Sequence, residues 1–394
     1  MRTSVAIIGA GPAGLLLARL LQRSGIESVV LESRSREHVE HRQRAGILEH
    51  GTVEVLRACG AGDRLDREGL VHEGIELRFG GTGHRIDLAA LTGGRRVVVY
   101  AQTEVVRDLV ALRVESGAPL LFEAEALAVE DVDSERPRVR YRHDGAERLL
   151  EADYVVGADG FHGIARRCVP AGRIRTRERT YPFAWLGVLA DVAPSTDELI
   201  YAQHERGFAL HSMRGPEVSR LYLQVPPETD LADWPDARIW EELDLRLAVD
   251  GGWRLRRGPI TDRSVTPMRS FVAEPLRCGR LLLAGDAAHI VPPTGAKGLN
   301  LAVADVALLA RALDAALLRG DPGALESYSD TALRRVWRAE DFSCAMTAML
   351  HADPDGDEFS RRLQRSRLDY AVSSTAAATA LAENYAGLPS DAVP

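Results

Sequence analysis

The chain has 394 residues, of which 45% are hydrophobic and 27% are charged, and its formal net charge is −8. This composition predicts a globular protein with a substantial core, and no run of about 18 apolar residues predicts a membrane span. The negative charge argues against a general nucleic-acid binder, and four cysteines without a Cys-x-x-Cys pair predict free thiols, a reducing cytoplasm and no metal site.

The first predicted element is an apolar strand, Val5–Ile8, that runs directly into Gly-x-Gly-x-x-Gly. Gly9 permits a tight turn, Gly11 lets the backbone approach a pyrophosphate, and Gly14 lets the following helix pack on the strand. Glu32 ends a second apolar strand and lies 18 residues after Gly14, near the spacing of an acid that binds a ribose. The pattern predicts a dinucleotide at the amino end of a helix and leaves NAD and FAD open.

A charged segment at residues 33–44 follows and has the composition of an exposed loop. Its position favours phosphate binding by Arg42 and Arg44, with a solvated connection as the alternative. Apolar spacing then predicts helices at 47–57 and 102–116, a strand at 73–79, short strands from 119 and a buried strand at 149–157.

Residues 181–266 concentrate aromatic side chains among alternating strands and predict a second, mainly antiparallel sheet. A predicted strand at 280–286 returns to the buried-strand pattern of the nucleotide-binding part of the chain. An Ala/Leu-rich segment predicts a buried helix at 299–319, and 328–350 and 359–385 are expected to be mostly helical.

Three separated motifs occur in order along the chain. They are Gly9–Gly14, an Asp159–Gly160 turn followed by Arg166, and Gly285–Asp286 followed by Ala-Ala-His. Together they resemble the FAD-binding pattern of the single-component aromatic flavoprotein monooxygenases. The resemblance implies FAD as the bound dinucleotide.

Further stretches, at residues 44–46, 69–74, 159–164, 207–210 and 285–301, are similar to the members of this family that act on 4-hydroxybenzoate. This similarity extends from Ala6 to Pro389. It implies hydroxylation of 4-hydroxybenzoate to 3,4-dihydroxybenzoate with NAD(P)H and O2, through a flavin C4a-hydroperoxide, in a homodimer.

The expected fold is α/β (α+β), with a Rossmann-like FAD-binding domain, a discontinuous antiparallel-sheet substrate domain and a helical C-terminal region. We place the FAD-binding domain at residues 1–70, 97–180 and 268–320. The substrate-binding domain is expected at 71–96 and 181–267, and the helical interface region at 321–394.

Four polar side chains on the strands around residue 216 point to an anion site. If residue 212 pairs with 222 and 214 with 220, then Ser212, Arg214, Arg220 and Tyr222 share one face of a hairpin. Two opposed arginines repel unless an anion lies near them, and a benzoate carboxylate would supply it. The alternative is a partly exposed hairpin neutralised by carboxylates elsewhere. The family resemblance assigns Ser212, Arg214 and Tyr222 to the carboxylate and places Arg220 toward the flavin.

The resemblance also implies a proton route at the phenol end of the substrate. Tyr201 is expected to relay the proton of the phenol and Tyr385 to extend the chain. His72 is expected to connect it to solvent, and its ordinary pKa suits proton transfer. Pro293 would offer its carbonyl to the same substrate oxygen.

A glycine-rich turn at 294–300 precedes the long helix, so free N–H groups and a positive helix end are expected to face the flavin. Lys297 either adds to the positive electrostatic field at the flavin or is solvated. The residues expected to contact FAD are Gly9, Gly11, Gly14, Glu32, Arg42, Arg44, Gln102, Asp159, Arg220, Asp286, Gly295, Lys297, Leu299 and Asn300.

No second Gly-x-Gly-x-x-Gly is visible, so the nicotinamide cofactor is expected to dock transiently on the flavin domain. His162 and Arg269 match family positions implicated in pyrophosphate contact. Arg34 and His38 offer cationic donors to a 2′-phosphate and favour NADPH, with NADH as a second option. Two other functions remain open: hydroxylation of a related aminobenzoate or dihydroxybenzoate, and flavin binding without catalysis.

Overall fold

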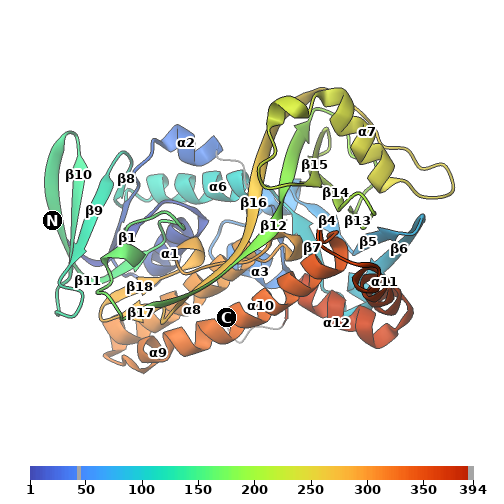
Figure 1. Ribbon diagram of the computed structural model, residues 1–394. Coiled ribbons are helices and arrows are strands. Elements are labelled where there is room, and N and C mark those ends of the chain that lie inside the picture. The colour runs from blue at the N-terminus through green and yellow to red at the C-terminus, as the bar shows by residue number, and fades with distance from the viewer. Residues whose placement is uncertain (42–45, 389–394) are drawn as a thin grey trace.

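A computed structural model describes residues 1–41 and 46–388, so the predicted ligands Arg42 and Arg44 lie outside the described residues. Within the described chain, two eight-stranded sheets and a three-stranded sheet form the framework (Figure 1). No helix in the part of the chain described is long and apolar enough to span a membrane.

The first sheet has a parallel centre in the order β18-β11-β1-β2-β8. β17 pairs with β18 in the antiparallel sense, and β9 and β10 extend from β11. Its strands are β1 (Arg2–Ile8), β2 (Ser28–Leu31), β8 (Leu120–Leu121), β9 (Glu125–Glu130), β10 (Arg138–His143), β11 (Ala146–Gly157), β17 (Arg277–Cys278) and β18 (Leu281–Leu283).

The helices that share a hydrophobic core with this sheet include α1 (Pro12–Arg23), α6 (Gln102–Glu115) and α8 (Gly298–Arg319). α1 packs between α6 and α8. A parallel centre with α1 directly after β1 is the arrangement of a dinucleotide-binding sheet, as the sequence predicts.

The second sheet has the order β19-β16-β12-β15-β14-β13-β5-β6. Its pairs are antiparallel, apart from β13 with β5. The strands are β5 (Gly74–Phe79), β6 (Thr82–Asp87), β12 (Arg175–Ala190), β13 (Leu199–Ala202), β14 (Ala209–Gly215), β15 (Val218–Val225), β16 (Ile260–Glu274) and β19 (His289–Ile290). α7 (Asp236–Leu247) covers one of its faces.

The two longest strands, β12 and β16, run side by side from the second sheet toward the first (Figure 1). The predicted boundaries at 180/181 and 267/268 therefore fall inside continuous strands rather than in linkers. The division into domains stays a prediction.

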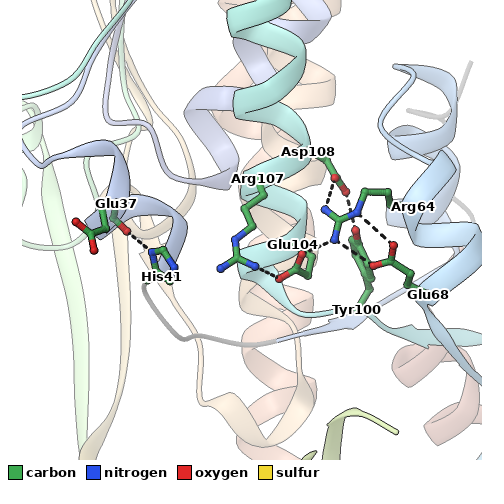
Figure 2. A network of polar contacts seen from close by, with 8 residues as sticks. All are labelled: Glu37, His41, Arg64, Glu68, Tyr100, Glu104, Arg107 and Asp108. Carbon is green, nitrogen blue, oxygen red and sulfur yellow. Dashed lines mark hydrogen bonds and ion pairs between the residues drawn. The ribbon is translucent and has the colours of Figure 1, made fainter.

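The small sheet, β3 (Ile47–Leu48), β7 (Val97–Val99) and β4 (Leu70–His72), is accompanied by α3 (His50–Ala58), α4 (Asp63–Glu68) and α5 (Leu88–Leu91). Arg64 of α4 donates to Asp108 at 2.7 Å and to Glu68 at 3.0 Å, and Tyr100 also donates to Asp108, at 2.7 Å (Figure 2). This network fixes the first turns of α6, where the predicted FAD ligand Gln102 lies.

The C-terminal part is helical: α9 (Gly323–Glu326), α10 (Tyr328–Leu350), α11 (Glu358–Ser373) and α12 (Thr375–Ala386). α10 contacts α8, β16 and the turn at Pro293–Gly295, whereas α12 packs on α5 and β6. The Tyr328 hydroxyl of α10 also donates to the Leu283 carbonyl oxygen of β18 at 2.9 Å, so the C-terminal helices touch both large sheets.

The predicted long helices are confirmed, but two local predictions are wrong. Residues 33–44 contain a short helix, α2 (Arg36–His41), supported by an Arg36–Glu40 ion pair one turn apart at 2.7 Å. The helix predicted at 47–57 begins only at His50, because residues 47 and 48 pair with β7 as a strand.

Candidate active site

The three glycine- and aspartate-containing turns meet at the carboxyl ends of β1, β11 and β18. Ile8 lies beside Gly157, and Gly157 beside Leu283, in the parallel ladder. The φ angle of Gly9 is +103°, and a Cβ there would lie 2.4 Å from the Ala158 carbonyl oxygen. Only glycine therefore permits this turn to pack against the next motif.

The first motif leaves open space at the amino end of α1. A Cβ on Gly11 would meet nothing within 4 Å, whereas a Cβ on Gly14 would lie 2.0 Å from the Gly9 carbonyl oxygen. The amides of the first helical turn have no carbonyl partner within the helix, and they carry the positive end of its dipole. The turn is therefore suited to a pyrophosphate over Gly11.

Glu32 braces this turn from the end of β2. Its Oε2 accepts from the Ala10 N–H and its Oε1 from the Arg34 N–H, both at 2.8 Å. Oε1 also accepts from the Ser33 hydroxyl at 3.3 Å, whereas Oε2 keeps a further lone pair. Ribose binding by Glu32 stays a prediction.

Arg166 joins the second and third motifs. Its guanidinium donates to the carbonyl oxygen of Phe161 at 2.6 Å and to that of Ala287 at 2.7 Å. Arg166 thus holds the turn after β11 against the turn after β18.

The two motif aspartates differ in their surroundings. Asp159 Oδ2 accepts from the Ala165 N–H at 2.9 Å, but its buried Oδ1 has no hydrogen-bond partner among the described residues. Burial raises the pKa of this carboxyl. Asp286, in contrast, is exposed. Both carboxyl groups therefore retain capacity for a ligand.

Asp305 is a positioning group that the sequence analysis missed. From inside α8, its Oδ2 accepts from the Gly285 N–H at 3.0 Å and lies 2.6 Å from His289 Nε2. Both side chains of the His289–Asp305 pair are 1% exposed. Burial alone would lower the pKa of His289, but Asp305 raises it above its ordinary value. The signal in the sequence is an acid inside the apolar stretch of the predicted helix.

Replacing Asp305 with asparagine is expected to lower the free energy of unfolding by about 3 kcal/mol, because His289 loses its buried counter-charge. FAD affinity should also fall, since the Gly285 turn is held less firmly. Denaturant unfolding at pH 7, with and without FAD, measures both. The control is Asp314→Asn on the same helix, where Asp314 pairs with exposed Arg319. Equal losses in the two variants would contradict the assignment.

The hairpin of β14 and β15 has a different register from the one predicted. Ser212 lies opposite Arg220, and Leu210 opposite Tyr222, with an irregularity between Met213 and Gly215. The predicted pairs 212–222 and 214–220 are therefore wrong by two residues, because the turn is a tight one at residues 216–217. A shift of two residues preserves the face, so Ser212, Arg220 and Tyr222 still lie on the same side.

Positive charge is concentrated around the Tyr222 hydroxyl. Arg220 Nε donates to Tyr222 Oη at 3.2 Å. Burial would raise the pKa of Tyr222, but the charges of Arg214 and Arg220 lower it overall. Burial also lowers the pKa of Arg214. Asp262 Oδ2 lies 3.8 Å from Arg220 Nη1 and is a weak neutralising partner at that distance. The cluster is suited to an organic anion.

The structure brings together the two tyrosines of the predicted proton route. Tyr201 Oη and Tyr385 Oη are 2.6 Å apart, and both residues are buried. Burial raises the pKa of each hydroxyl. His72 is 1% exposed, and neither ring nitrogen has a partner among the described residues. Burial lowers its pKa to about 4. Its side chain therefore does not reach the surface directly.

The turn before α8 is held by α10 and α3. Pro293 is exposed, and its carbonyl accepts from the Ala296 N–H at 3.0 Å, which leaves one lone pair. A Cβ on Gly295 would lie 2.6 Å from Ser343 Oγ, so any side chain at this position would force the Ser343 hydroxyl of α10 to move. Leu299 is buried in the first turn of the helix.

Lys297 is neither solvated nor an uncompensated charge. It is 5% exposed, forms an ion pair with Glu49 and donates to the Tyr385 carbonyl oxygen at 3.1 Å. Asn300 accepts from the Glu49 N–H at 2.9 Å and donates to the Ile47 carbonyl at 3.0 Å. Both residues therefore join the turn to α3 and α12, a role the sequence did not reveal.

The residues predicted to dock the nicotinamide cofactor fall into two groups. His162 lies edge-on to Phe161 with ring centroids 5.0 Å apart, and the Arg269 guanidinium lies 4.7 Å over the same ring. Arg34 and His38 are both exposed, and Arg34 lines a separate hollow of about 430 Å³ that includes acidic side chains. Within the described chain, no group of three His, Cys, Asp or Glu side chains could hold a metal ion.

Comparison with known proteins agrees with this geometry. A family model described as an FAD binding domain matches residues 2–343. The p-hydroxybenzoate hydroxylase of Acinetobacter baylyi is 49% identical over 389 residues, which cover 99% of this chain and 96% of the relative. The chain belongs to the FAD-dependent monooxygenases. It is an enzyme of that family and binds FAD.

A further relative and a solved structure are similar to this chain at lower identity. The 3-amino-4-hydroxybenzoate 2-monooxygenase of Streptomyces cremeus is 29% identical to this monooxygenase over 385 residues, 92% of this chain and 91% of the relative. The crystal structure of p-nitrophenol 4-monooxygenase from Pseudomonas putida has a TM-score of 0.85 at 21% identity and covers 99% of this chain and 100% of its own. The latter confirms the fold.

The residues of the monooxygenase fit FAD. The space over Gly11, the unpartnered Asp159 oxygen and the exposed Asp286 carboxylate lie at adjoining strand ends. When bound, FAD accepts a hydride from a reduced nicotinamide and activates O2. The contacts of individual residues with FAD stay predictions.

Proposed function

We propose that this monooxygenase hydroxylates 4-hydroxybenzoate to 3,4-dihydroxybenzoate with NAD(P)H and O2. One observation carries the proposal: Tyr201 and Tyr222 lie in one cross-strand row, each paired with Leu210 between them. The three side chains face the same side of the sheet. The two tyrosines are two strand spacings apart, on the order of 10 Å between backbones. That interval suits one benzene ring with substituents at opposite ends.

The two ends of this row have complementary chemistry. At one end Arg214, Ser212 and Tyr222 would hold a carboxylate, with Arg214 as the planar two-fold donor. At the other end Tyr201 would hydrogen-bond the phenol oxygen and pass its proton to Tyr385, 2.6 Å away. Loss of that proton increases the electron density at the ring carbon ortho to the phenol oxygen. This is the carbon to be hydroxylated.

Burial explains why two tyrosines can serve as this route. Their raised pKa values keep both hydroxyls neutral, so a proton moves by exchange along the hydrogen bond. We propose that His72 passes the proton onward. Because its imidazole is 1% exposed, this last step requires water between the ring and the surface.

NAD(P)H oxidation by the FAD-loaded protein tests the function. We expect slow oxidation alone and rapid oxidation with 4-hydroxybenzoate. 4-Aminobenzoate and 3,4-dihydroxybenzoate share the carboxylate and serve as comparison substrates. Faster turnover with either would replace the proposed substrate. An unchanged rate with all three would point to flavin binding without this catalysis.

We predict NADPH as the preferred reductant, with NADH as a weaker substitute, because Arg34 and His38 offer exposed cationic donors for a 2′-phosphate. Glu37, which precedes His38 on α2, opposes this preference. Steady-state kcat/KM for both reductants at fixed substrate and salt measures it. A clear preference for NADH would contradict the assignment of Arg34 and His38.

We propose further that the enzyme is a cytoplasmic homodimer. On α11, Phe359 is 70% exposed, Leu363 44% and Tyr370 61%, and their spacing places them on one face. Such an apolar stripe is suited to contact with a second copy. The four cysteines are free thiols, which is consistent with the cytoplasm.

A further inference from the structure

The C-terminal half of α10 lies between the Pro293–Gly295 turn and the second sheet. Thr294, in the turn, and Thr347, on α10, have hydroxyl oxygens 2.9 Å apart, and both residues are fully or almost fully buried. Thr347 Oγ1 also lies 2.7 Å from the Ser343 carbonyl, which can only accept. The single proton of the Thr347 hydroxyl can be donated to either of these two acceptors, so this hydroxyl joins α10 to the turn.

One turn later on the same helix, His351 continues this series of hydrogen bonds. His351 Nδ1 is 3.1 Å from the Thr347 carbonyl oxygen, and the Trp185 indole N–H donates to His351 Nε2 at 2.6 Å. The two partners fix one neutral tautomer, with the proton on Nδ1. Burial lowers the pKa of His351 to about 3, so the imidazole stays neutral.

Aromatic contacts link His351 to the cross-strand row that contains Tyr201 and Tyr222. The His351 ring stacks with Phe183 and with Phe208, at centroid distances of 4.7 Å and 4.4 Å. Trp185 packs against Tyr222 with ring centroids 4.8 Å apart. Phe208 lies 6.2 Å from the ring of Tyr201. His351 therefore supports groups near both ends of the proposed substrate site.

A separate clamp holds the end of α10 to the sheet. The Gln224 side chain donates to the Ala352 carbonyl at 2.6 Å and accepts from the Ala352 N–H at 3.0 Å and the Phe208 N–H at 2.9 Å. Loss of the threonine hydroxyl or of the imidazole leaves this clamp in place. The Thr294–Thr347–His351–Trp185 series can therefore be broken without undocking the helix.

We propose that Thr347 and His351 are positioning residues that set the alignment of the substrate ring against the flavin, by joining the Pro293–Gly295 turn to the Trp185–Tyr222 wall. The proposal rests on the proposed function. Errors in alignment of about 1 Å can reduce a reaction rate a hundredfold. Breaking the series should leave binding intact and divert reducing equivalents, so that NAD(P)H, H⁺ and O2 yield NAD(P)⁺ and hydrogen peroxide.

The test compares Thr347→Val, which keeps the shape and deletes the hydroxyl, with Thr347→Ser, which keeps the hydroxyl. In Thr347→Val we expect three- to tenfold less 3,4-dihydroxybenzoate per NAD(P)H, with peroxide accounting for the remainder. FAD content and 4-hydroxybenzoate affinity should stay within twofold of wild type. Thr347→Ser should restore coupling, and Thr331→Val, on the same helix, should be coupled like wild type.

His351→Phe keeps the aromatic stack and removes both hydrogen bonds, so it should uncouple more strongly than Thr347→Val. If His351→Phe fails to fold, the comparison of Thr347→Val with Thr347→Ser still tests the proposal. Full coupling in Thr347→Val, or equal uncoupling in Thr347→Val and Thr347→Ser, overturns the proposal.

A second readout separates this inference from the proposed function. The visible absorbance of bound FAD is recorded while 4-hydroxybenzoate is added. We expect the ligand-induced change in wild type and Thr347→Ser, and at least a threefold smaller change in Thr347→Val. If wild type makes no 3,4-dihydroxybenzoate but this pattern holds, the function fails and the alignment role stands. An equal or absent change in all three proteins overturns the alignment role.

Discussion

Substitution of Arg214 by lysine is expected to weaken 4-hydroxybenzoate binding about a hundredfold, a loss of roughly 3 kcal/mol, while FAD stays bound. A lysine keeps the charge but not the planar pair of donors that matches a carboxylate. Arg214→Ala should weaken binding further, because only Ser212 and Tyr222 would then remain to hold the carboxylate. Substrate-stimulated oxidation of NAD(P)H should fall in parallel.

Equilibrium titration of each FAD-loaded variant with 4-hydroxybenzoate measures this effect. Arg263→Lys is a suitable control, because Arg263 belongs to the same sheet but pairs with Asp236 near the surface. Its affinity should match that of wild type. Unchanged affinity in both Arg214 variants would show that the carboxylate binds elsewhere.

Tyr201→Phe is expected to separate oxygen consumption from hydroxylation. The substitution keeps the ring and deletes the hydroxyl that lies 2.6 Å from Tyr385, so the phenol of the substrate loses its proton acceptor. General acid–base groups contribute about 10²–10⁴-fold to a rate. We expect at least tenfold less 3,4-dihydroxybenzoate per NAD(P)H, with most of the oxygen released as hydrogen peroxide.

Parallel assays of peroxide and 3,4-dihydroxybenzoate give this ratio. Tyr385→Phe should change the ratio in the same direction by a smaller factor, because Tyr385 is the second member of the route. Tyr141→Phe controls for loss of a buried tyrosine hydroxyl, since Tyr141 is 2% exposed within the first sheet. Full coupling at the wild-type rate in Tyr201→Phe would show that Tyr201 only packs.

Local signals predict much of this fold. The glycine turn, the parallel strands beside it and the long helices at 299–319 and 328–350 follow from residue periodicity and turn chemistry. The register of β14 and β15 could not be predicted in this way, because alternation fixes the face of a strand but not the position of its turn. The lengths of β12 and β16, 16 and 15 residues, were not predicted either.

The candidate site depends more on contacts between distant segments. The resemblance supplied Tyr201 and Tyr385, 184 positions apart, and the structure places their hydroxyls in contact. The buried Asp305, which holds the Gly285 turn, and Glu49, which pairs with Lys297, were not predicted. Nothing in the local sequence of Lys297 distinguishes a buried ion pair from a solvated side chain.

The central claim is that this chain transfers one oxygen atom of O2 to the ring of 4-hydroxybenzoate. Mass spectrometry of the product of one incubation under ¹⁸O2, with the FAD-loaded enzyme and NADPH, tests it most directly. We expect 3,4-dihydroxybenzoate that carries a single ¹⁸O atom. Recovery of unchanged 4-hydroxybenzoate while NADPH is consumed, or a hydroxylated product whose new oxygen is ¹⁶O from water, would contradict it.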